Sequence, residues 1–415
     1  MDIRKSESKK RAKRTLCIPV TRKKYIECIS NSYMFRAMIL ETIEIYPELF
    51  PAEIKRGFEM KDIRQSKKQR LTIRRIVIGS IAWSIRPSFL LPYMTAGSEE
   101  AEKALFLRKF AVPYWAIAHS HGRDPMFWFR ISQTIGNHSV LATTISRSND
   151  LPENLAADEK HTRLMGKKCY IATVVADEVV LNADISLSAG TKDLTESYGV
   201  FQKEAKALNS DYKPKSVNID GWQATKQAWK QLFPGIAIVL CFLHVFIGIR
   251  DRCSKKYRSV FSEVADKLWN CYRADTKKSF SQRVRRLTEW VKKAEMPKLI
   301  VEKIEKLRKK LPLYSCAYDL PGAHRTSNML DRLMQRMDRH LFDTQYFHGG
   351  KAAANRSIHS WALVQNFAPS NLNTVKKYKT FESPADRFNR STYSENWLEN
   401  LLISASRGMV KIGSP

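Results

Sequence analysis

The sequence lacks the features that mark membrane proteins and disulfide-rich proteins. Its longest apolar run, residues 236–249, has 14 residues and includes His244, which is too short to span a bilayer. The seven cysteines are odd in number and form no Cys-x-x-Cys pair, as is typical of reduced thiols in the cytosol. The polar first residues are not followed by an apolar run, so no signal peptide is expected. We therefore expect a soluble cytoplasmic protein without internal repeats.

The sequence also has little negative charge. Its 415 residues include 71 Lys and Arg but only 41 Asp and Glu, a formal net charge of +30. Residues 1–90 hold 21 basic and 9 acidic side chains, and residues 250–310 hold 20 and 8. Such an excess indicates a polyanionic partner, because neutralising phosphates releases condensed counterions. Nucleic acid fits best; the alternatives are a ribosome-associated protein, a merely very soluble protein, and a membrane surface.

The first 150 residues are expected to be helical. Residues 31–46 have helical apolar spacing and stop at Pro47, and a second, basic helix is expected near 66–85. These two helices could form a helix-turn-helix that reads DNA, although a solvated basic face explains the charges equally well. More helix is expected over 98–145, beginning with a Ser98 cap. The residues assigned to DNA binding are Lys67, Lys68, Arg70, Arg74 and Arg75.

From about residue 151 the pattern predicts a mixed α/β sheet. Residues 168–176 and 179–187 are predicted strands, and Asp177 and Glu178 make the tight turn between them. A hairpin followed by alternating helices and strands is typical of a mixed sheet. The elements expected next are a helix, a short strand, a second helix and an apolar strand, over 191–209, 216–220, 223–232 and 237–244.

Strand-like sequence stops after His244. Residues 245–311 predict long charged helices, for example over 281–294 and 298–310. A final helix with a distinct apolar stripe begins near Asn328. The tail after residue 350 contains only short helical pieces.

Asp220 is the acid best placed to bind a metal ion. It ends the strand of residues 216–220, in which Ser216, Asn218 and Asp220 face one way, and Gly221 follows. Hard cations prefer carboxylate ligands, and phosphoryl transfer on DNA uses two such ions about 4 Å apart. The alternative is a helix cap or an Asx turn leading into the next helix.

Asp158 and Asp331 are the other candidate ligands. Asp158 can face outward while Leu155 and Ala157 face a core, although a solvated turn charge is the simpler explanation of this residue alone. Asp331 lies in the first turn of the final helix, where a capping box with Asn328 is its alternative role. The apolar stripe of that helix consists of Met329, Leu330, Leu333, Met334, Met337 and Leu341.

Cys241 and His244 are expected at the end of the apolar strand. A zinc site needs about four ligands, and Cys253 is the only nearby addition, so zinc is not expected. The pair is either a buried structural pair or a pair of groups near an active site.

Together these residues resemble transposases of the Mutator-like group. The motifs that carry the resemblance are ADEKH with Asp158, NIDGW with Asp220, CFLH with Cys241 and His244, and TSNMLD with Asp331. The resemblance covers residues 150–350 best. It departs at one position, because the third acid of the group is usually Glu and is Asp331 here. Glu395 is the alternative third acid.

The resemblance implies a ribonuclease-H-like catalytic domain of the DDE/D type, an α/β fold with a mixed five-stranded sheet interrupted by an all-helical insertion. The implied domains are a helical basic DNA-binding region over 1–150, the catalytic domain over 151–350 with its insertion at about 245–325, and a C-terminal tail over 351–415.

The resemblance also implies a mechanism. Two Mg²⁺ or Mn²⁺ ions held by Asp158, Asp220 and Asp331 activate water to cut at the terminal inverted repeats of a mobile element. The freed 3′ hydroxyl then attacks target DNA. The implied protein is a homodimer or larger assembly on DNA, nucleoid-associated in a prokaryotic cytoplasm, with no membrane partner. The alternatives are a ribonuclease-H-like nuclease or resolvase, and an inactive transposase-derived protein that only binds DNA.

Overall fold

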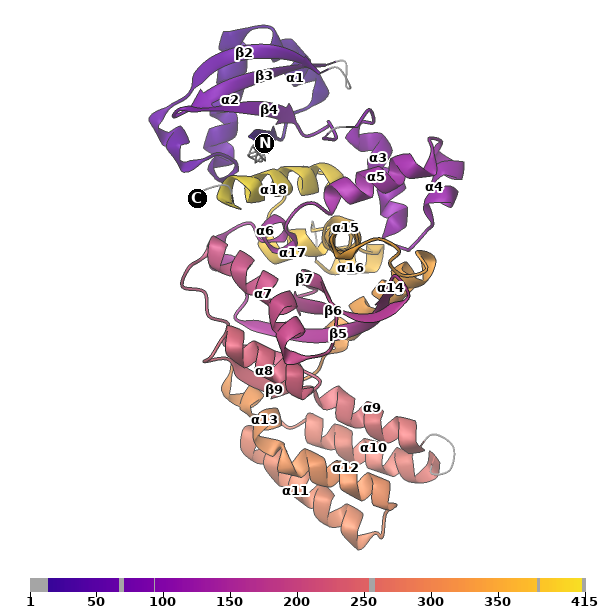
Figure 1. Cartoon of the computed structure of the whole chain (residues 1–415). Helices are drawn as coiled ribbons and strands as arrows, with labels where there is room; N and C mark the ends of the chain where they lie inside the picture. The colour runs from indigo at the N-terminus through magenta and orange to yellow at the C-terminus, as the bar shows by residue number, and fades with distance from the viewer. Residues whose placement is uncertain (1–13, 67–70, 93, 254–257, 379–380, 413–415) are drawn as a thin grey trace, which may run out of the picture. The chain divides into compact units, whose positions relative to one another are not determined.

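The chain folds into two compact units, each with its own sheet (Figure 1). The computed structural model describes residues 14–66, 71–92, 94–253, 258–378 and 381–412. Unit 1 combines residues 1–148 with 359–415, and unit 2 is residues 149–358. Among the described residues, no helix has the length and apolar character needed to cross a bilayer.

Unit 1 contains a four-stranded mixed sheet where the sequence predicted a basic helix. The strands lie in the order β1-β4-β3-β2, with β1 parallel to β4 and the other pairs antiparallel. The helix expected near 66–85 is wrong, because that stretch forms β3 and β4 around a turn at Gly79, whose φ is +60°. The helix-turn-helix is therefore wrong as well. The bounds are β1 Thr15–Ile18, β2 Glu59–Ser66, β3 Leu71–Ile78 and β4 Ile81–Pro87.

Helices from both ends of the chain build the rest of unit 1. The helix expected over 31–46 is confirmed as α2, which ends at Ile45. Helix α3 begins at Ser98 and its N-cap is Gly97, so the cap lies one residue before the position that the sequence predicted. The helices are α1 Arg22–Ile29, α2 Ser32–Ile45, α3 Ser98–Arg108, α4 Tyr114–His121, α5 Pro125–Ile135, α6 Val140–Thr144, α16 Leu372–Lys377, α17 Pro384–Asn389 and α18 Trp397–Ile412.

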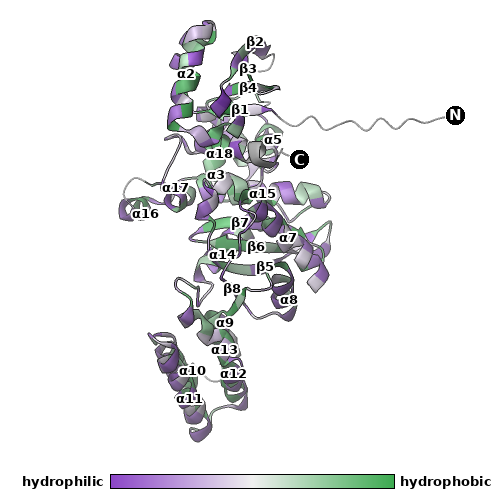
Figure 2. Cartoon of the chain, turned by 90° about the vertical axis from the view of Figure 1, so that its left-hand side faces the viewer, coloured by the Kyte–Doolittle hydropathy of each residue, from purple (hydrophilic) through white to green (hydrophobic). Residues whose placement is uncertain are grey.

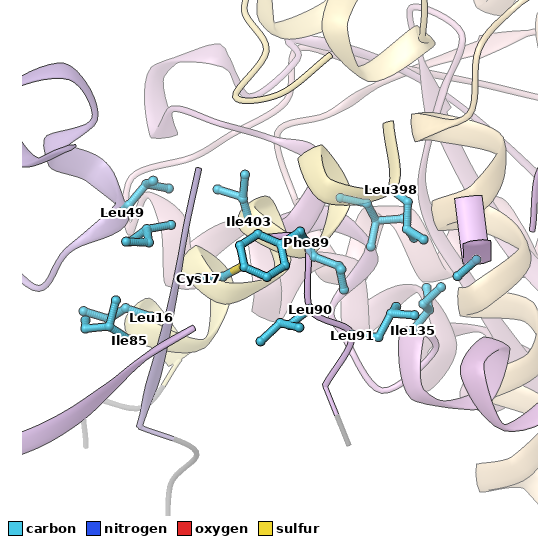
Figure 3. Packing of buried hydrophobic residues seen from close by; sticks show 14 of the residues in the cluster. Leu16, Cys17, Leu49, Ile85, Phe89, Leu90, Leu91, Ile135, Leu398 and Ile403 are labelled. Carbon is cyan, nitrogen blue, oxygen red and sulfur yellow. The ribbon is translucent and has the colours of Figure 1, made fainter. Parts of the chain in front are cut away.

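The core of unit 1 joins strand β1 to the C-terminal helix α18. Leu16 and Cys17 on β1 pack in one buried cluster with Leu398 and Ile403 on α18 (Figure 3). The backbone N–H of Cys17 also donates to the Ser406 hydroxyl at 2.8 Å. The C-terminal residues 359–415 therefore complete the core begun by the first strand.

Unit 2 contains the five-stranded mixed sheet that the sequence predicted. Its order is β7-β6-β5-β8-β9, with β5, β6 and β7 antiparallel to one another and β8 and β9 parallel to β5. The predicted hairpin turn at Asp177 and Glu178 is confirmed, with both residues at positive φ as a two-residue turn of this kind requires. The bounds are β5 Asn154–Leu164, β6 Lys167–Ala176, β7 Val179–Ser186, β8 Ser216–Ile219 and β9 Ala237–Leu240.

Helices cover both faces of this sheet (Figure 2). Helices α7 (Thr191–Leu208) and α8 (Gln223–Leu232) lie on one face and bury Tyr198 and Trp229. Helix α14 (Asn328–Asp343) lies on the other face, where its Asp338 forms an ion pair with Lys160 of β5 at 2.6 Å. Because side chains alternate along a strand, Asp158 shares the face of Lys160 and therefore faces α14.

A helical insertion separates β9 from α14, as predicted. Its helices enclose a buried apolar cluster that includes Phe242, Leu268, Val284 and Ile300. The apolar strand expected over 237–244 is too long, because β9 ends at Leu240 and a helix begins at Phe242. The helices are α9 Phe242–Cys253, α10 Arg258–Tyr272, α11 Lys277–Lys293, α12 Lys298–Lys309 and α13 Leu311–Ser315, and α15 Lys351–Phe367 follows α14.

Candidate active site

The register of three neighbouring strands brings Asp158, inside β5, into one row with Asp220 and Cys241, which directly follow β8 and β9. In the parallel register, Ala156 of β5 lies opposite Asn218 of β8. The same register carried two residues further places Asp220 opposite Asp158. On the other side, Ile219 pairs with Leu240 of β9, so the next residue there is Cys241. Neighbouring strands are about 4.8 Å apart, so these three residues follow one another across the sheet.

The carboxylates of Asp220 and Asp331 act electrostatically on that of Asp158. The pKa of Asp158 is raised from 3.8 to about 6, first by burial and then by the negative charge of Asp220, with a smaller effect of Asp331. A carboxyl group with such a pKa is destabilised in its charged form and is favourably placed to gain from a cation. Asp220 and Asp331 therefore lie near enough to Asp158 for their charges to act on its carboxyl group.

Each acid uses one oxygen locally and leaves the other available. Asp158 Oδ1 accepts from the Glu159 backbone N–H at 2.8 Å, and Asp220 Oδ1 accepts from the Trp222 backbone N–H at 2.7 Å. Asp331 Oδ2 accepts from the Ser327 hydroxyl at 2.9 Å. No other described group hydrogen-bonds these carboxylates. The Asx turn considered for Asp220 therefore exists, and it still leaves Oδ2 without a hydrogen bond.

The three side chains are of the type that hard divalent cations such as Mg²⁺ prefer. All three are carboxylates, and each has one oxygen without a hydrogen bond. Their spacing is wider than ligation requires: within the described ranges, no three His, Cys, Asp or Glu side chains lie close enough together to hold a metal ion. Like charges in a partly buried site repel, so the side chains would have to move closer around a bound cation.

A polar segment before α14 holds Asp331 against the sheet. Two side chains on the Asp158 face of the sheet donate to this segment: Asn154 Nδ2 to the Pro321 carbonyl and Asn218 Nδ2 to the His324 carbonyl, both at 2.9 Å. The segment thus crosses β5 and β8 before α14 begins. Asn218 was predicted to face the same way as Asp220, but its part in holding the third acid was not.

Ser327 connects this segment to the row of strand ends. Its backbone N–H donates to the Cys241 sulfur at 3.2 Å, and its hydroxyl donates to Asp331. Ser327 is also the N-cap position of α14, so the predicted capping box between Asn328 and Asp331 is wrong: the helix begins at Asn328. Cys241 is therefore buried beside the site and supports the residue that contacts Asp331.

His244 lies in the first turn of α9 rather than on a strand. Its pKa is raised to about 9, mainly by the adjacent Cys241 side chain and further by the charges of Asp158 and Asp220, while burial opposes the rise. The imidazole is therefore protonated at neutral pH and partly offsets the negative charge of the acids. Of the two roles left open by the sequence, the position of His244 favours a group near the site.

Glu159 is a buried acid of this region that the sequence did not single out. Its Oε1 accepts from the Tyr198 hydroxyl at 2.8 Å and from the Thr225 hydroxyl at 2.7 Å, which ties β5 to α7 and α8. Burial raises the pKa of Glu159 to about 7, and Oε2 is buried without a described hydrogen-bond partner. The alternation of β5 was the available signal, because Glu159 must face opposite Asp158.

Two of the residues assigned to DNA binding, Arg74 and Arg75, lie among the described residues of unit 1, and both have partners within the protein. Arg74 is only 5% exposed and donates to the Ile29 carbonyl at 3.1 and 2.8 Å, so it stabilises the fold and its assignment to DNA is wrong. Arg75 is paired with Asp62. Glu395, the alternative third acid, is exposed and belongs to unit 1. Lys67, Lys68 and Arg70 lie outside the described residues.

Comparison with known proteins adds no relative to this picture. No protein-family model matches the chain, and no curated protein matches it.

Proposed function

We propose that the chain is a DNA transposase whose unit 2 is a ribonuclease-H-like domain. The observation that carries the proposal is the placement of the acids. Asp158 lies on the first strand of the sheet in chain order and Asp220 directly follows the fourth, as in the family that the chain resembles. The negative charges of Asp220 and Asp331 both raise the pKa of Asp158. The strand order, with a central first strand and parallel fourth and fifth strands, agrees with that fold.

The three carboxylates would bind two Mg²⁺ or Mn²⁺ ions. Bound there, such ions would neutralise the attacking and leaving oxygens of an in-line phosphoryl transfer. The protein's own part is to hold the ligands in place: Asp158 and Asp220 are fixed by strand register, and Asp331 by Ser327. Protonated His244 lowers the repulsion among the acids before DNA arrives.

The helical insertion supplies a basic surface for DNA. Arg286 and Lys293 on α11 and Lys298 on α12 are exposed, and none of them is paired with an acid among the described residues. Free cations of this kind neutralise phosphates, whereas Lys292 is already paired with Glu305 at 2.8 Å. These residues would hold the DNA that flanks the reacting phosphate.

A nicking assay with the DNA that flanks the gene, in Mg²⁺ or Mn²⁺, tests the proposal. Wild-type protein should nick at the ends of inverted repeats and join them to a target plasmid. Asp220→Ala should abolish both reactions, whereas Asp211→Ala, at an exposed position of unit 2, should change neither. Nicking without joining would indicate the nuclease alternative.

Two observations favour the second candidate, a transposase-derived protein that only binds DNA. The acids are spaced more widely than a metal site requires, and the third is Asp rather than Glu. DNA binding that survives Asp220→Ala, with no metal-dependent cleavage by wild-type protein, would establish that candidate instead.

A further inference from the structure

Three aromatic side chains of unit 2 lie together, two from within β5 and β6 and one from the turn after β8. His161 of β5 pairs in register with Tyr170 of β6, and their ring centroids are 5.6 Å apart. The Tyr170 ring lies 5.8 Å from that of Trp222, which precedes α8. Trp222 is 39% exposed although it is a large aromatic residue. Its neighbours support the ring at one side and leave part of it open to solvent.

The turn after β8 ties Trp222 closely to Asp220. The Trp222 backbone N–H donates to the Asp220 carboxylate at 2.7 Å, and two residues span at most about 7 Å. Gly221 between them has a φ of +100°, and a Cβ built there would lie 3.0 Å from Leu240 Cδ2. Glycine suits this turn best, and the hydrogen bond from Trp222 to Asp220 holds the two residues close together.

Positive charge accompanies these rings. Lys168 Nζ lies 5.5 Å from the centroid of the Tyr170 ring. Lys167 and Lys168 are both exposed, and neither is paired with an acid in the described part of the chain. Aromatic rings interleaved with free cations are the combination that binds single-stranded nucleic acid, because the bases stack on the rings and the phosphates meet the cations.

We infer that His161, Tyr170 and Trp222, on the α7–α8 face of the sheet, form a stacking platform for an unpaired nucleobase of the DNA strand that passes Asp220. This inference rests on the proposed function. The base of a paired nucleotide is covered by its neighbours in the duplex, so the platform favours DNA that is unpaired or distorted at the site. Trp222 supplies the largest ring and carries most of the preference.

Equilibrium binding of two fluorescein-labelled probes tests the inference: a 40-base-pair duplex, and the same duplex with a three-nucleotide single-stranded gap. The full-length protein is used in Ca²⁺, so that binding is followed without requiring cleavage. Wild type should prefer the gapped probe. Trp222→Ala should reduce that preference about 5- to 150-fold, as expected for the loss of one base–aromatic contact.

Two variants serve as controls. Trp222→Phe keeps a ring and should retain most of the preference, which separates stacking from misfolding. Trp115→Ala removes a tryptophan that is 68% exposed in unit 1 and should leave the preference unchanged. Equal binding of both probes by wild type, or an unchanged preference in Trp222→Ala, would overturn the inference. Loss of nicking in Asp220→Ala is read separately, so failure of the platform and failure of the proposed function are distinguishable.

Discussion

Replacing Asp158 by Asn should stabilise the metal-free protein at neutral pH. The charged Asp158 carboxylate is half-buried near two other acids, and its pKa is raised from 3.8 to about 6. Asn has almost the same shape and keeps an oxygen that can accept the Glu159 N–H. The substitution therefore removes an unfavourable charge at little cost in packing.

The size and pH dependence of this effect follow from the pKa. Each pKa unit corresponds to about 1.4 kcal/mol, so a rise from 3.8 to about 6 destabilises the folded state by about 3 kcal/mol. Between these two pH values the folded state binds more protons than the unfolded state, so stability falls as the pH rises. Asp158→Asn should thus gain nothing near pH 4 and the full amount above about pH 6.

Amide hydrogen exchange of β5 and β8, in chelator, measures this stability for unit 2 alone. Saturating Mg²⁺ should stabilise wild type, by about 2.7 kcal/mol at a hundredfold excess over the dissociation constant, and should stabilise Asp158→Asn much less. Asp211→Asn, at an exposed position, is the control. An Asp158→Asn protein that is less stable than wild type in chelator at pH 7, or equally stabilised at pH 4, would refute the reasoning.

Four further substitutions test how the third acid is held. Asp331→Glu should support metal-dependent nicking because it keeps the carboxylate, whereas Asp331→Ala should lower the nicking rate more than about 100-fold. Ser327→Ala removes the hydroxyl that donates to Asp331 and should lower that rate about 10- to 100-fold, with the thermal unfolding midpoint nearly unchanged. Asn218→Ala leaves the His324 carbonyl without its donor and should lower the free energy of unfolding of unit 2 by about 1–3 kcal/mol, measured by hydrogen exchange.

The sheet of unit 2 was predictable because its strands carry strong local signals. The turn at Asp177 and Glu178 separates two apolar strands, and Asp220 with Gly221 marks the end of a third. The end of β9 was not predictable in the same way. Residues 237–249 are apolar throughout, and an apolar run without periodicity does not distinguish a buried strand from a buried helix.

The prediction of a basic helix in the N-terminal region was wrong because it relied on the charges. Lysines and arginines over 67–75 suggested a basic helix, but Ile73, Ile76 and Ile78 are β-branched residues that favour strands. The turn at Gly79 was the signal for a hairpin. Arg74 illustrates the remaining limit, since a sequence does not show that an arginine is buried on backbone carbonyls.

The site was predictable where strand register decides it and not where tertiary contacts do. Asp220 follows from the end of its predicted strand, whereas Asp158 was singled out by the ordered motifs that carry the resemblance. Ser327 and Cys241 are 86 residues apart in the sequence, and no local sequence pattern predicts the hydrogen bond between them. The same holds for Glu159, whose partners come from two different helices.

The polar segment before α14, which holds Asp331 against the sheet, has a consequence for biosynthesis. Asp158 and Asp220 emerge from the ribosome before the insertion, and Asp331 emerges only after it. The last acid reaches the other two only when the chain beyond the insertion has returned over Asn154 and Asn218. A nascent or truncated chain therefore holds two acids without the third, and cutting activity would arise only once unit 2 is whole.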